Sequence, residues 1–280
     1  MQWVGTAFPD LTKLTPFNEG GQKWVFSAVH PSDGDVVLKI IHPNQDPEAA
    51  RREILAVQQI KSSRVPEIFE TGQVTTPVGV CVWIRERRVH GISLRERLQQ
   101  GPLNAQEILR LCLHMLEPLV LAEQAHIVHR DVKPENIIVD PNGDFWLLDF
   151  GISRHLTMSP LTRASSPFGK FTLGYAPPEQ LRNVQTDIDS RADLFALGVT
   201  IYEAAGARHP FLSGTADVAE IIKRVESLVL PPLLLNCKAS ASFRDLIGAM
   251  LQKRRDHRPG SAAEALDWIT DVIEHETTAP

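Results

Sequence analysis

Cysteine is scarce in this chain, which has only Cys81, Cys112 and Cys237 in 280 residues. They form neither a paired framework nor a CxxC motif, so the sequence offers no disulfide scaffold and no thiolate metal site. The ten histidines also lack the spacing of zinc ligands, so no structural zinc site is expected. We therefore expect buried, reduced thiols and a cytoplasmic protein.

Long apolar runs are absent as well. The stretch Leu228–Leu235 is interrupted by Pro231 and Pro232 and is too short to span a bilayer. The first residues, Met1–Gly5, show no basic region followed by an apolar core, so no signal peptide is expected. The net charge of −5 gives no electrostatic reason to expect nucleic acid or an anionic membrane as a partner. The sequence does not indicate an oligomeric state.

What is present is the composition of an ordinary globular protein, 43% apolar and 22% charged, with enough residues for one large or two modest cores. The first third predicts strands at Trp24–Val29 and Val36–Ile41, separated by a turn over residues 31–35. Further strand material lies at Ile68–Phe69 and Val78–Ile84. Between these strands, Asp46 is a plausible N-cap for a helix that continues through Ile54, Val57 and Ile60.

From Asn104 onward the pattern predicts helices. Asn104 and Glu107 form a capping box before apolar residues at helical spacing, and Pro118 indicates a kink in that helix or a break and restart. Asp193–Ala205 predicts a buried helix. A second capping box, Ser261 with Glu264, begins a last helix, and we expect a disordered tail over residues 277–280.

The residues with the clearest chemistry lie in the segment His129–Asn136 and in the triplet Asp149-Phe150-Gly151. An aspartate can accept a hydroxyl proton, and a lysine can neutralise a transferring phosphoryl group. An asparagine and an aspartate can hold magnesium. Phosphoryl transfer needs such a set, because its catalysis consists mostly of positioning and charge neutralisation.

This H-R-D-x-K-P-x-N octet followed by D-F-G resembles the catalytic and metal-binding loops of protein kinases. The resemblance covers almost the whole chain and implies an α+β, bilobal fold: a strand-rich N-lobe over residues 1–86, a hinge over 87–91 and a mainly helical C-lobe over 92–276. It implies ATP and Mg²⁺ as cofactors. It also implies roles for four residues: Asp131 as the base, Lys133 on the γ-phosphoryl group, and Asn136 and Asp149 as metal ligands.

The stretch Asn18–Val25 resembles the glycine-rich loop that covers the triphosphate in this family. It departs from that pattern at Asn18 and Lys23, which stand at the first and third glycine. Lys23 reaches a phosphate or points to solvent, and the sequence leaves both open. Taken alone, Gly20-Gly21 predicts only a hairpin turn. The nucleotide contacts that the resemblance implies here are Asn18, Gly20, Gly21 and Val25.

Lys39 resembles the lysine that holds the α- and β-phosphates in protein kinases, and Glu53 is its expected helix partner. The alternatives are a lysine that extends to solvent from an edge strand, and Glu48 as the partner. The hinge is expected at Arg87, Arg88 and Val89, where backbone groups would bind the purine. Glu86 then occupies the gatekeeper position, and a charge buried there needs a partner.

Lys133 is typical of serine/threonine kinases, and the segment containing Thr172 resembles the region that supports a serine or threonine acceptor. Glu179 is expected to pair with Arg258 and hold the substrate platform, and Asp193 to brace the catalytic loop. His129 and Phe150 are expected to pack in a hydrophobic spine. Together these features favour a protein substrate.

Arg130 resembles the arginine that receives an activation-loop phosphate. We expect autophosphorylation among the hydroxyl residues that follow Gly151, although hydroxyls also simply suit loops. These residues are Ser153, Thr157, Ser159, Thr162, Ser165 and Ser166.

The leading interpretation is an active serine/threonine protein kinase. A pseudokinase that binds nucleotide as a scaffold for a protein partner is the alternative, supported by the degenerate glycine-rich stretch and by Glu86. Kinase action on a small molecule is a third class, which the platform around Thr172 and Glu179 disfavours.

Overall fold

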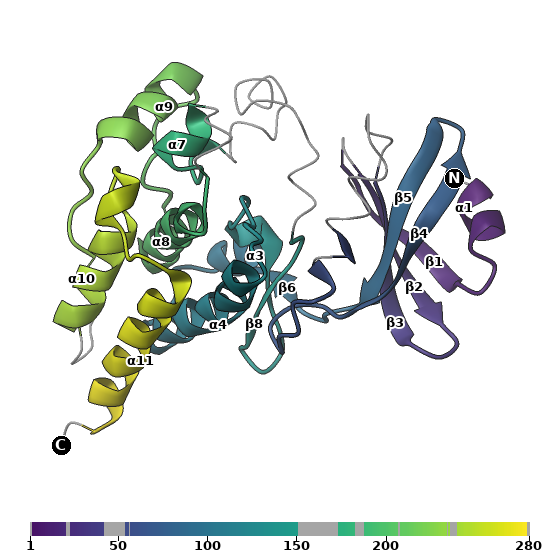
Figure 1. Cartoon of the computed structure of the whole chain (residues 1–280), viewed down its shortest axis with the longest axis horizontal. Helices are drawn as coiled ribbons and strands as arrows, with labels where there is room; N and C mark the ends of the chain where they lie inside the picture. The colour runs from purple at the N-terminus through teal and green to yellow at the C-terminus, as the bar shows by residue number, and fades with distance from the viewer. Residues whose placement is uncertain are drawn as a thin grey trace.

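Five antiparallel strands form the N-terminal sheet in the order β1-β2-β3-β5-β4 (Figure 1). The computed structural model describes residues 2–20, 23–41, 54–55, 57–150, 173–182, 188–206, 208–233, 235 and 240–278. The strands are β1 (Thr12–Gly20), β2 (Lys23–His30), β3 (Gly34–Ile41), β4 (Ile68–Thr76) and β5 (Gly79–Arg87). The four strands predicted from the sequence are confirmed. β1 was missed, because its pairing with β2 is interrupted by two register shifts and its residues do not alternate cleanly.

A short helix, α1 (Gln2–Ala7), covers the outer face of this sheet. Val4 is buried in a small core with Phe26, Leu38, Ile40 and Cys81. Two edge-to-face aromatic contacts add to it: Trp3 with Trp24 and Phe8 with Trp83, at ring-centroid distances of 5.6 and 5.2 Å. The sequence did not predict α1, whose six residues are too few to show a helical period.

The C-terminal lobe is built mainly of helices, and a small antiparallel sheet lies at its edge beside α3 and α4 (Figure 1). The helices are α3 (Leu94–Leu98), α4 (Ala105–Gln124), α7 (Pro178–Leu181), α8 (Arg191–Gly206), α9 (Val218–Ser227), α10 (Ser240–Met250) and α11 (Ala262–Thr278). The short elements are β6 (Ile92–Ser93), β7 (Ile137–Val139), β8 (Phe145–Leu147) and the 3-10 turns η1 (Pro134–Asn136) and η3 (Arg255–His257).

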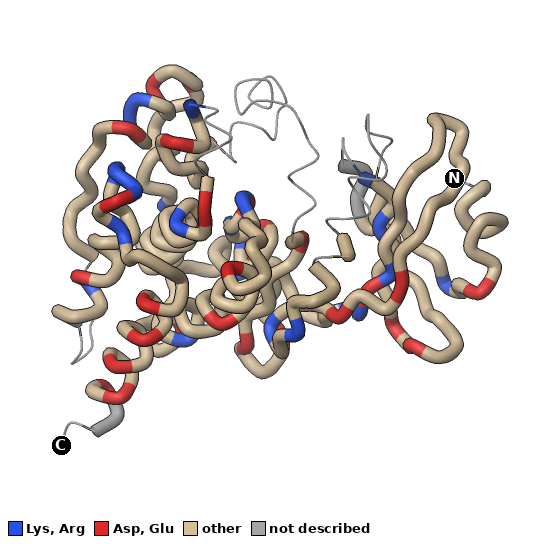
Figure 2. Tube along the Cα trace, viewed as in Figure 1, with Lys and Arg blue, Asp and Glu red and all other residues tan. Residues whose placement is uncertain are grey.

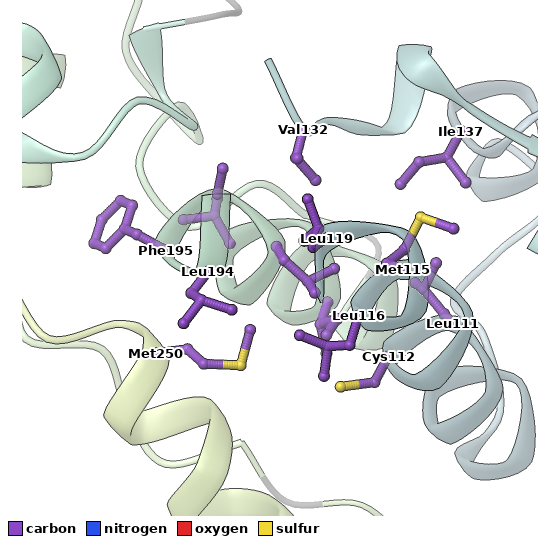
Figure 3. Packing of buried hydrophobic residues seen from close by; sticks show 14 of the residues in the cluster. Leu111, Cys112, Met115, Leu116, Leu119, Val132, Ile137, Leu194, Phe195 and Met250 are labelled. Atoms are coloured by element: carbon purple, nitrogen blue, oxygen red, sulfur yellow. The ribbon is translucent and has the colours of Figure 1, made fainter. Parts of the chain in front are cut away.

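The main core lies between α4, α8 and α10 (Figure 3). Leu111, Met115 and Leu119 of α4 belong to one buried cluster with Leu194 of α8 and with Val132 of the catalytic loop. The two cysteines in the described chain, Cys81 and Cys112, are buried and free of disulfides, as expected, while Cys237 lies outside the described residues. This packing gives the catalytic loop a rigid base.

The helix boundaries confirm most of the sequence prediction. Asn104 caps α4 with the reciprocal Glu107 contact. Of the two alternatives expected at Pro118, a break and restart is wrong: α4 is a single helix from Ala105 to Gln124, since burial of its apolar face outweighs one lost hydrogen bond.

The capping box expected at the start of α11, Ser261 with Glu264, is present in a modified form. The Ser261 hydroxyl accepts from the Glu264 N–H, but the Glu264 carboxylate accepts from the N–H of Gly260. α11 itself contains no glycine or proline and continues through Thr278. The disordered tail expected over residues 277–280 stays a prediction. Residues 279 and 280 lie outside the described residues.

Acidic and basic residues are interspersed along both lobes (Figure 2). Within the described ranges, no helix is both long and apolar enough to cross a lipid bilayer. The chain leaves β5 at Arg87 and enters β6 at Ile92, so the connection between the lobes is short. The lobe boundary at residue 86 and the hinge over 87–91 stay predictions.

Candidate active site between the lobes

The catalytic loop is fixed from below by Asp193 at the start of α8. Its two carboxylate oxygens accept the backbone N–H groups of His129 and Arg130, each at 2.7 Å. Burial raises the pKa of Asp193, while these amides and the nearby basic groups oppose that rise. Arg130 adopts a φ of 65°, a conformation unusual for arginine, and the Asp193 contact holds it there. The expected bracing role of Asp193 is therefore visible as two hydrogen bonds.

The Asp131 carboxylate is oriented by two neighbours in its own segment. Lys133 Nζ lies 2.8 Å from it, and Asn136 Nδ2 donates to Oδ2 at 2.9 Å. The same amide nitrogen also donates to the Asp131 carbonyl at 2.8 Å. The 3-10 turn η1 brings Asn136 back toward Asp131, which makes this local cluster possible. A carboxylate held in this way has a fixed direction in which to accept a proton.

His129 and Phe150 pack against each other, as the sequence predicted. Their ring centroids are 4.7 Å apart in an edge-to-face arrangement, and His129 is fully buried. The Asp131 N–H donates to His129 Nδ1, so the ring hydrogen sits on Nε2 and is donated to the Leu148 carbonyl at 2.8 Å. Both ring nitrogens thus make hydrogen bonds within the protein, and His129 has a structural role.

Four charged side chains form a row beneath the N-terminal sheet, in the order Lys23, Asp149, Lys39 and Glu86. Lys23 Nζ lies 2.6 Å from Asp149 Oδ2, and Lys39 Nζ lies 2.7 Å from Asp149 Oδ1. Lys39 Nζ also lies 2.5 Å from Glu86 Oε1. We call this set the charge row. Cations and anions alternate along it, so each charge lies beside an opposite one.

Electrostatics in the charge row are dominated by burial and by these contacts. Burial alone would raise the pKa of Asp149, but the ammonium groups of Lys23 and Lys39 outweigh it and hold that pKa well below its usual range. For Lys39, burial opposes the charged form, and Asp149 and Glu86 together raise its pKa instead. For Glu86 burial prevails over Lys39 and raises the pKa. Asp149 is the most firmly ionised acid of the row.

Glu86 has the counter-charge that its position demanded. β3 and β5 pair with Val37 opposite Glu86 and Lys39 opposite Ile84, which puts Lys39 and Glu86 diagonally on one face. Lys39 is 4% exposed and Glu86 7%. The alternative that Lys39 extends to solvent from an edge strand is wrong, because β3 lies between β2 and β5.

The other expected partners of Lys39, Glu53 and Glu48, lie outside the described residues.

The glycine-rich stretch forms the β1–β2 pair, with Asn18 opposite Val25 and Gly20 opposite Lys23. This agrees with the hairpin alternative for its backbone. Gly21 lies outside the described residues. Lys23, which the sequence left undecided, directs its ammonium to Asp149.

The hinge residues differ in what their backbone N–H groups contact. The N–H of Arg87 donates to the Glu67 carbonyl at 2.8 Å, and that of Arg88 donates to the Asp35 carbonyl at 3.1 Å. Within the described part of the chain, the N–H of Val89 has no such partner. Val89 therefore offers a backbone donor at the position where a purine is expected.

Asn136 and Asp149 suit a divalent cation by the chemistry of their donors. The Leu148 N–H donates to the Asn136 carbonyl at 2.8 Å, which brings the two residues to the same end of β7 and β8. An amide oxygen and a carboxylate are hard ligands, and Mg²⁺ is usually held by one or two carboxylates plus substrate phosphates. Among the described residues no cluster of three or more His, Cys, Asp or Glu could hold a metal by itself. The residues therefore fit a cation that is shared with a nucleotide.

The Glu179–Arg258 pair expected from the sequence is present. The two guanidinium nitrogens lie 2.6 and 3.0 Å from the two carboxylate oxygens, and the Arg258 side chain is fully buried. Arg258 also donates to the carbonyls of Gln252 and Arg191 at 2.8 and 2.9 Å. Thr172, the other platform residue, lies outside the described residues.

A network that the sequence did not reveal links the platform to the catalytic loop. Arg95 of α3 contacts Glu135 at 2.8 Å, Glu203 at 2.6 Å and the Tyr175 hydroxyl at 2.6 Å, and Tyr175 also donates to Glu203. Burial, then Glu203, raises the pKa of Tyr175 well above its usual value. The four residues come from four distant segments, so no local spacing could have predicted the network.

The candidate phosphorylation sites follow Gly151 in the chain. Residues 151–172 lie outside the described residues, and with them the hydroxyl residues named as candidates. Those candidates are Ser153, Thr157, Ser159, Thr162, Ser165 and Ser166.

Comparison with known proteins identifies the class. Residues 14–276 match the model of the protein kinase domain, and the chain belongs to that family. It is 29% identical over 88% of its length to the serine/threonine-protein kinase PknB of Mycolicibacterium smegmatis. It is 31% identical over 90% to the probable serine/threonine-protein kinase PkwA of Thermomonospora curvata. The chain spans only 40% and 33% of the lengths of these relatives. The bilobal α+β kinase fold predicted from the sequence is confirmed.

Proposed function

We propose that this chain transfers the γ-phosphoryl group of ATP to serine or threonine hydroxyls of protein substrates. The observation that carries the proposal is the Asp131 carboxylate, which is held by Lys133 and Asn136. Family membership and relatives named serine/threonine-protein kinases support the same function. A cytoplasmic location and protein substrates belong to this proposal.

Each residue then has a defined task. Asp131 accepts the hydroxyl proton of the substrate, and Lys133 neutralises charge on the γ-phosphoryl group. Lys39 binds the α- and β-phosphates, and its contact with Glu86 keeps it in place. Asn136 and Asp149 would hold Mg²⁺, which neutralises charge on the phosphate oxygens when bound.

The nucleotide base is expected at the hinge. The N–H of Val89 supplies a donor to the purine, while those of Arg87 and Arg88 are used within the protein. Val25 and the backbone of Asn18 and Gly20 lie on the paired strands β1 and β2, which we expect to cover the triphosphate. Glu86 contributes to nucleotide binding indirectly, by holding Lys39 in position.

A phosphotransfer assay tests the proposal. Purified protein is incubated with labelled ATP, Mg²⁺ and a generic protein acceptor, beside Asp131→Asn and Asp149→Ala variants. Loss of a positioned base is expected to slow transfer by about 10²–10⁴-fold in Asp131→Asn. Transfer no greater than in the Asp149→Ala control would overturn the proposal.

The second candidate is a pseudokinase that binds nucleotide and docks a protein partner. The relatives named serine/threonine-protein kinases do not favour it, although Asp149, the expected metal ligand, contacts two ammonium groups. The same assay separates the two, because a scaffold would bind ATP without transferring phosphate. Kinase action on a small molecule is disfavoured by the Glu179–Arg258 pair, a part of the protein-substrate platform.

We propose further that the loop after Gly151 is autophosphorylated. A phosphate there would gain charge-assisted contacts with arginine, and Arg130 precedes the catalytic base. Phosphosites are mapped on wild-type protein and on Asp131→Asn, expressed identically. Equal loop phosphate in both would exclude autophosphorylation.

A further inference from the structure

Lys23 is the one feature of the glycine-rich stretch that the proposed function leaves unused. It stands at the end of β2, opposite Gly20 of β1, and its ammonium lies 2.6 Å from Asp149 Oδ2. In the family pattern this position is a glycine, whose backbone approaches the phosphates. Here a four-carbon side chain with a positive charge reaches into the site instead.

The two lysines on Asp149 are held to different degrees. Lys39 has a second acidic partner in Glu86, and its side chain is 5% exposed. The Lys23 side chain is 24% exposed, and Asp149 is its only ion-pair partner among the described residues. If Lys39 moved, Glu86 would stay buried without its counter-charge. If Lys23 moved, only Asp149 would lose a partner, and Asp149 would still have Lys39. Lys23 is therefore the ammonium that Asp149 can exchange.

A divalent cation held by Asp149 would compete with Lys23 for that carboxylate. Both are positive, so the cation and the ammonium repel each other at contact distance. A nucleoside triphosphate brings several negative charges into the same site, and a lysine ammonium is a compact, rotatable phosphate ligand. The ammonium that leaves Asp149 thus has a new anionic partner within the same site.

We propose that Lys23 is a second phosphate-binding lysine, which exchanges Asp149 for the triphosphate when a metal–nucleotide complex binds. Lys39 then serves as the anchored cation of the site and Lys23 as the exchangeable one. This proposal rests on the proposed function, since it requires that the site bind ATP. It predicts that Lys23 affects the metal and the phosphates with opposite signs.

The experiment measures equilibrium binding of three probes to the full chain: ATP with saturating Mg²⁺, adenosine, and Mn²⁺ alone. The variant is Lys23→Met, which keeps the length of the side chain and removes its charge. We expect affinity for ATP to fall about tenfold or more, because a charge-assisted contact to phosphate is lost. Adenosine, which lacks phosphates, is expected to bind unchanged. Mn²⁺ is expected to bind more tightly, because its competitor for Asp149 is gone.

Two controls accompany the variant. Lys61→Met removes an exposed lysine of the same lobe and is expected to change none of the three affinities. Lys23→Arg keeps the charge and is expected to retain most of the affinity for ATP. Thermal unfolding of each protein reports whether the fold is intact.

Unchanged ATP affinity in Lys23→Met would overturn the proposal, and so would a parallel loss of ATP and adenosine or a weaker affinity for Mn²⁺. A wild-type protein that fails to bind ATP would instead overturn the proposed function, and this proposal with it. Binding of ATP by the wild type, measured first, makes these two failures distinct.

Discussion

Each lobe contains an ion pair between residues distant in sequence, and the two pairs differ in the number and geometry of the contacts that their cations make. Arg258 binds Glu179 through two parallel contacts and uses its remaining N–H groups on backbone carbonyls. Lys39 binds Glu86 and Asp149 as a point charge through a single nitrogen. The guanidinium fork fixes direction as well as charge, whereas an ammonium can turn toward another anion.

This difference matches the tasks proposed for the two sites. The pair in the C-lobe stacks on Phe195, with the guanidinium carbon 4.9 Å from the ring centroid, and holds the platform. The charge row joins Lys23, Lys39 and Glu86 of the N-terminal sheet to Asp149 of the C-lobe and has few other contacts, so we expect that a phosphate can replace one partner. The Glu179–Arg258 pair, whose N–H groups are all used, is suited to a rigid role. The charge row, with fewer contacts for each charge, is suited to exchange of one ion-pair partner.

The largest effect is expected from Arg258→Met. This change leaves Glu179 without its bidentate partner and removes donors to buried carbonyls, so the free energy of unfolding should fall by about 3–5 kcal/mol. Urea denaturation measures it. Arg258→Lys is the matched control, and it should recover only part of the loss because lysine cannot form the fork. If Arg258→Lys were as stable as the wild type, the two parallel contacts of the guanidinium group would not matter for stability.

A smaller loss is expected from Lys39→Met, about 2 kcal/mol, because Glu86 is left buried without its ammonium partner. Since burial already raises the pKa of Glu86, protonation should relieve part of that cost. The double variant Lys39→Met/Glu86→Leu should regain most of the stability, as measured in the same denaturation series. If it is no more stable than Lys39→Met, the two residues do not act as a pair.

The platform side can be tested through His209, which packs on Tyr175 with ring centroids 4.6 Å apart. Its Nδ1 accepts the N–H groups of Phe211 and Leu212, and burial, then Arg95, lowers the pKa of His209 to about 3. A depressed histidine pKa stabilises the fold above the unfolded value near 6.5, and that contribution is lost as the pH falls from there toward 3.

Between pH 6.5 and 5 this group should cost the wild type about 2 kcal/mol of unfolding free energy. His209→Asn keeps an acceptor but cannot take up the proton, so its decline over the same pH range should be shallower by that amount. Denaturation midpoints at pH 7, 6 and 5 measure both slopes. Equal slopes would show that His209 does not titrate with folding.

The smallest effect on stability is expected from Glu86→Gln. Lys39 retains Asp149, and the amide still offers an oxygen, so the free energy of unfolding should change by about 1 kcal/mol or less. The KM for ATP should change more visibly than stability, because the ammonium loses the charge that keeps it in place. Ile84→Val, on the same strand face, is the control for packing. A KM equal to that of the wild type would mean that Glu86 does not position Lys39.

Local patterns predicted the elements that depend on local chemistry. Asn104 and Glu107 cap α4 as their three-residue spacing required, and Asp131, Lys133 and Asn136 meet because one short turn contains them all. The sequence did not predict β1 and α1, because neither is specified by a regular local pattern. β1 has an irregular register, and α1 folds only because the sheet offers its apolar residues a surface.

By itself, then, the sequence determined the kinase class, the clustering of Asp131, Lys133 and Asn136, and the residues that pair as Glu179 and Arg258. Only the tertiary structure decided what Lys23 and Glu86 contact. Lys23 and Asp149 are 126 positions apart and meet because the sheet lies over the C-lobe. Glu86 faces Lys39 because of the register between β3 and β5. Electrostatic partners are chosen by distance in space, and distance in space is what the packing of the two lobes sets.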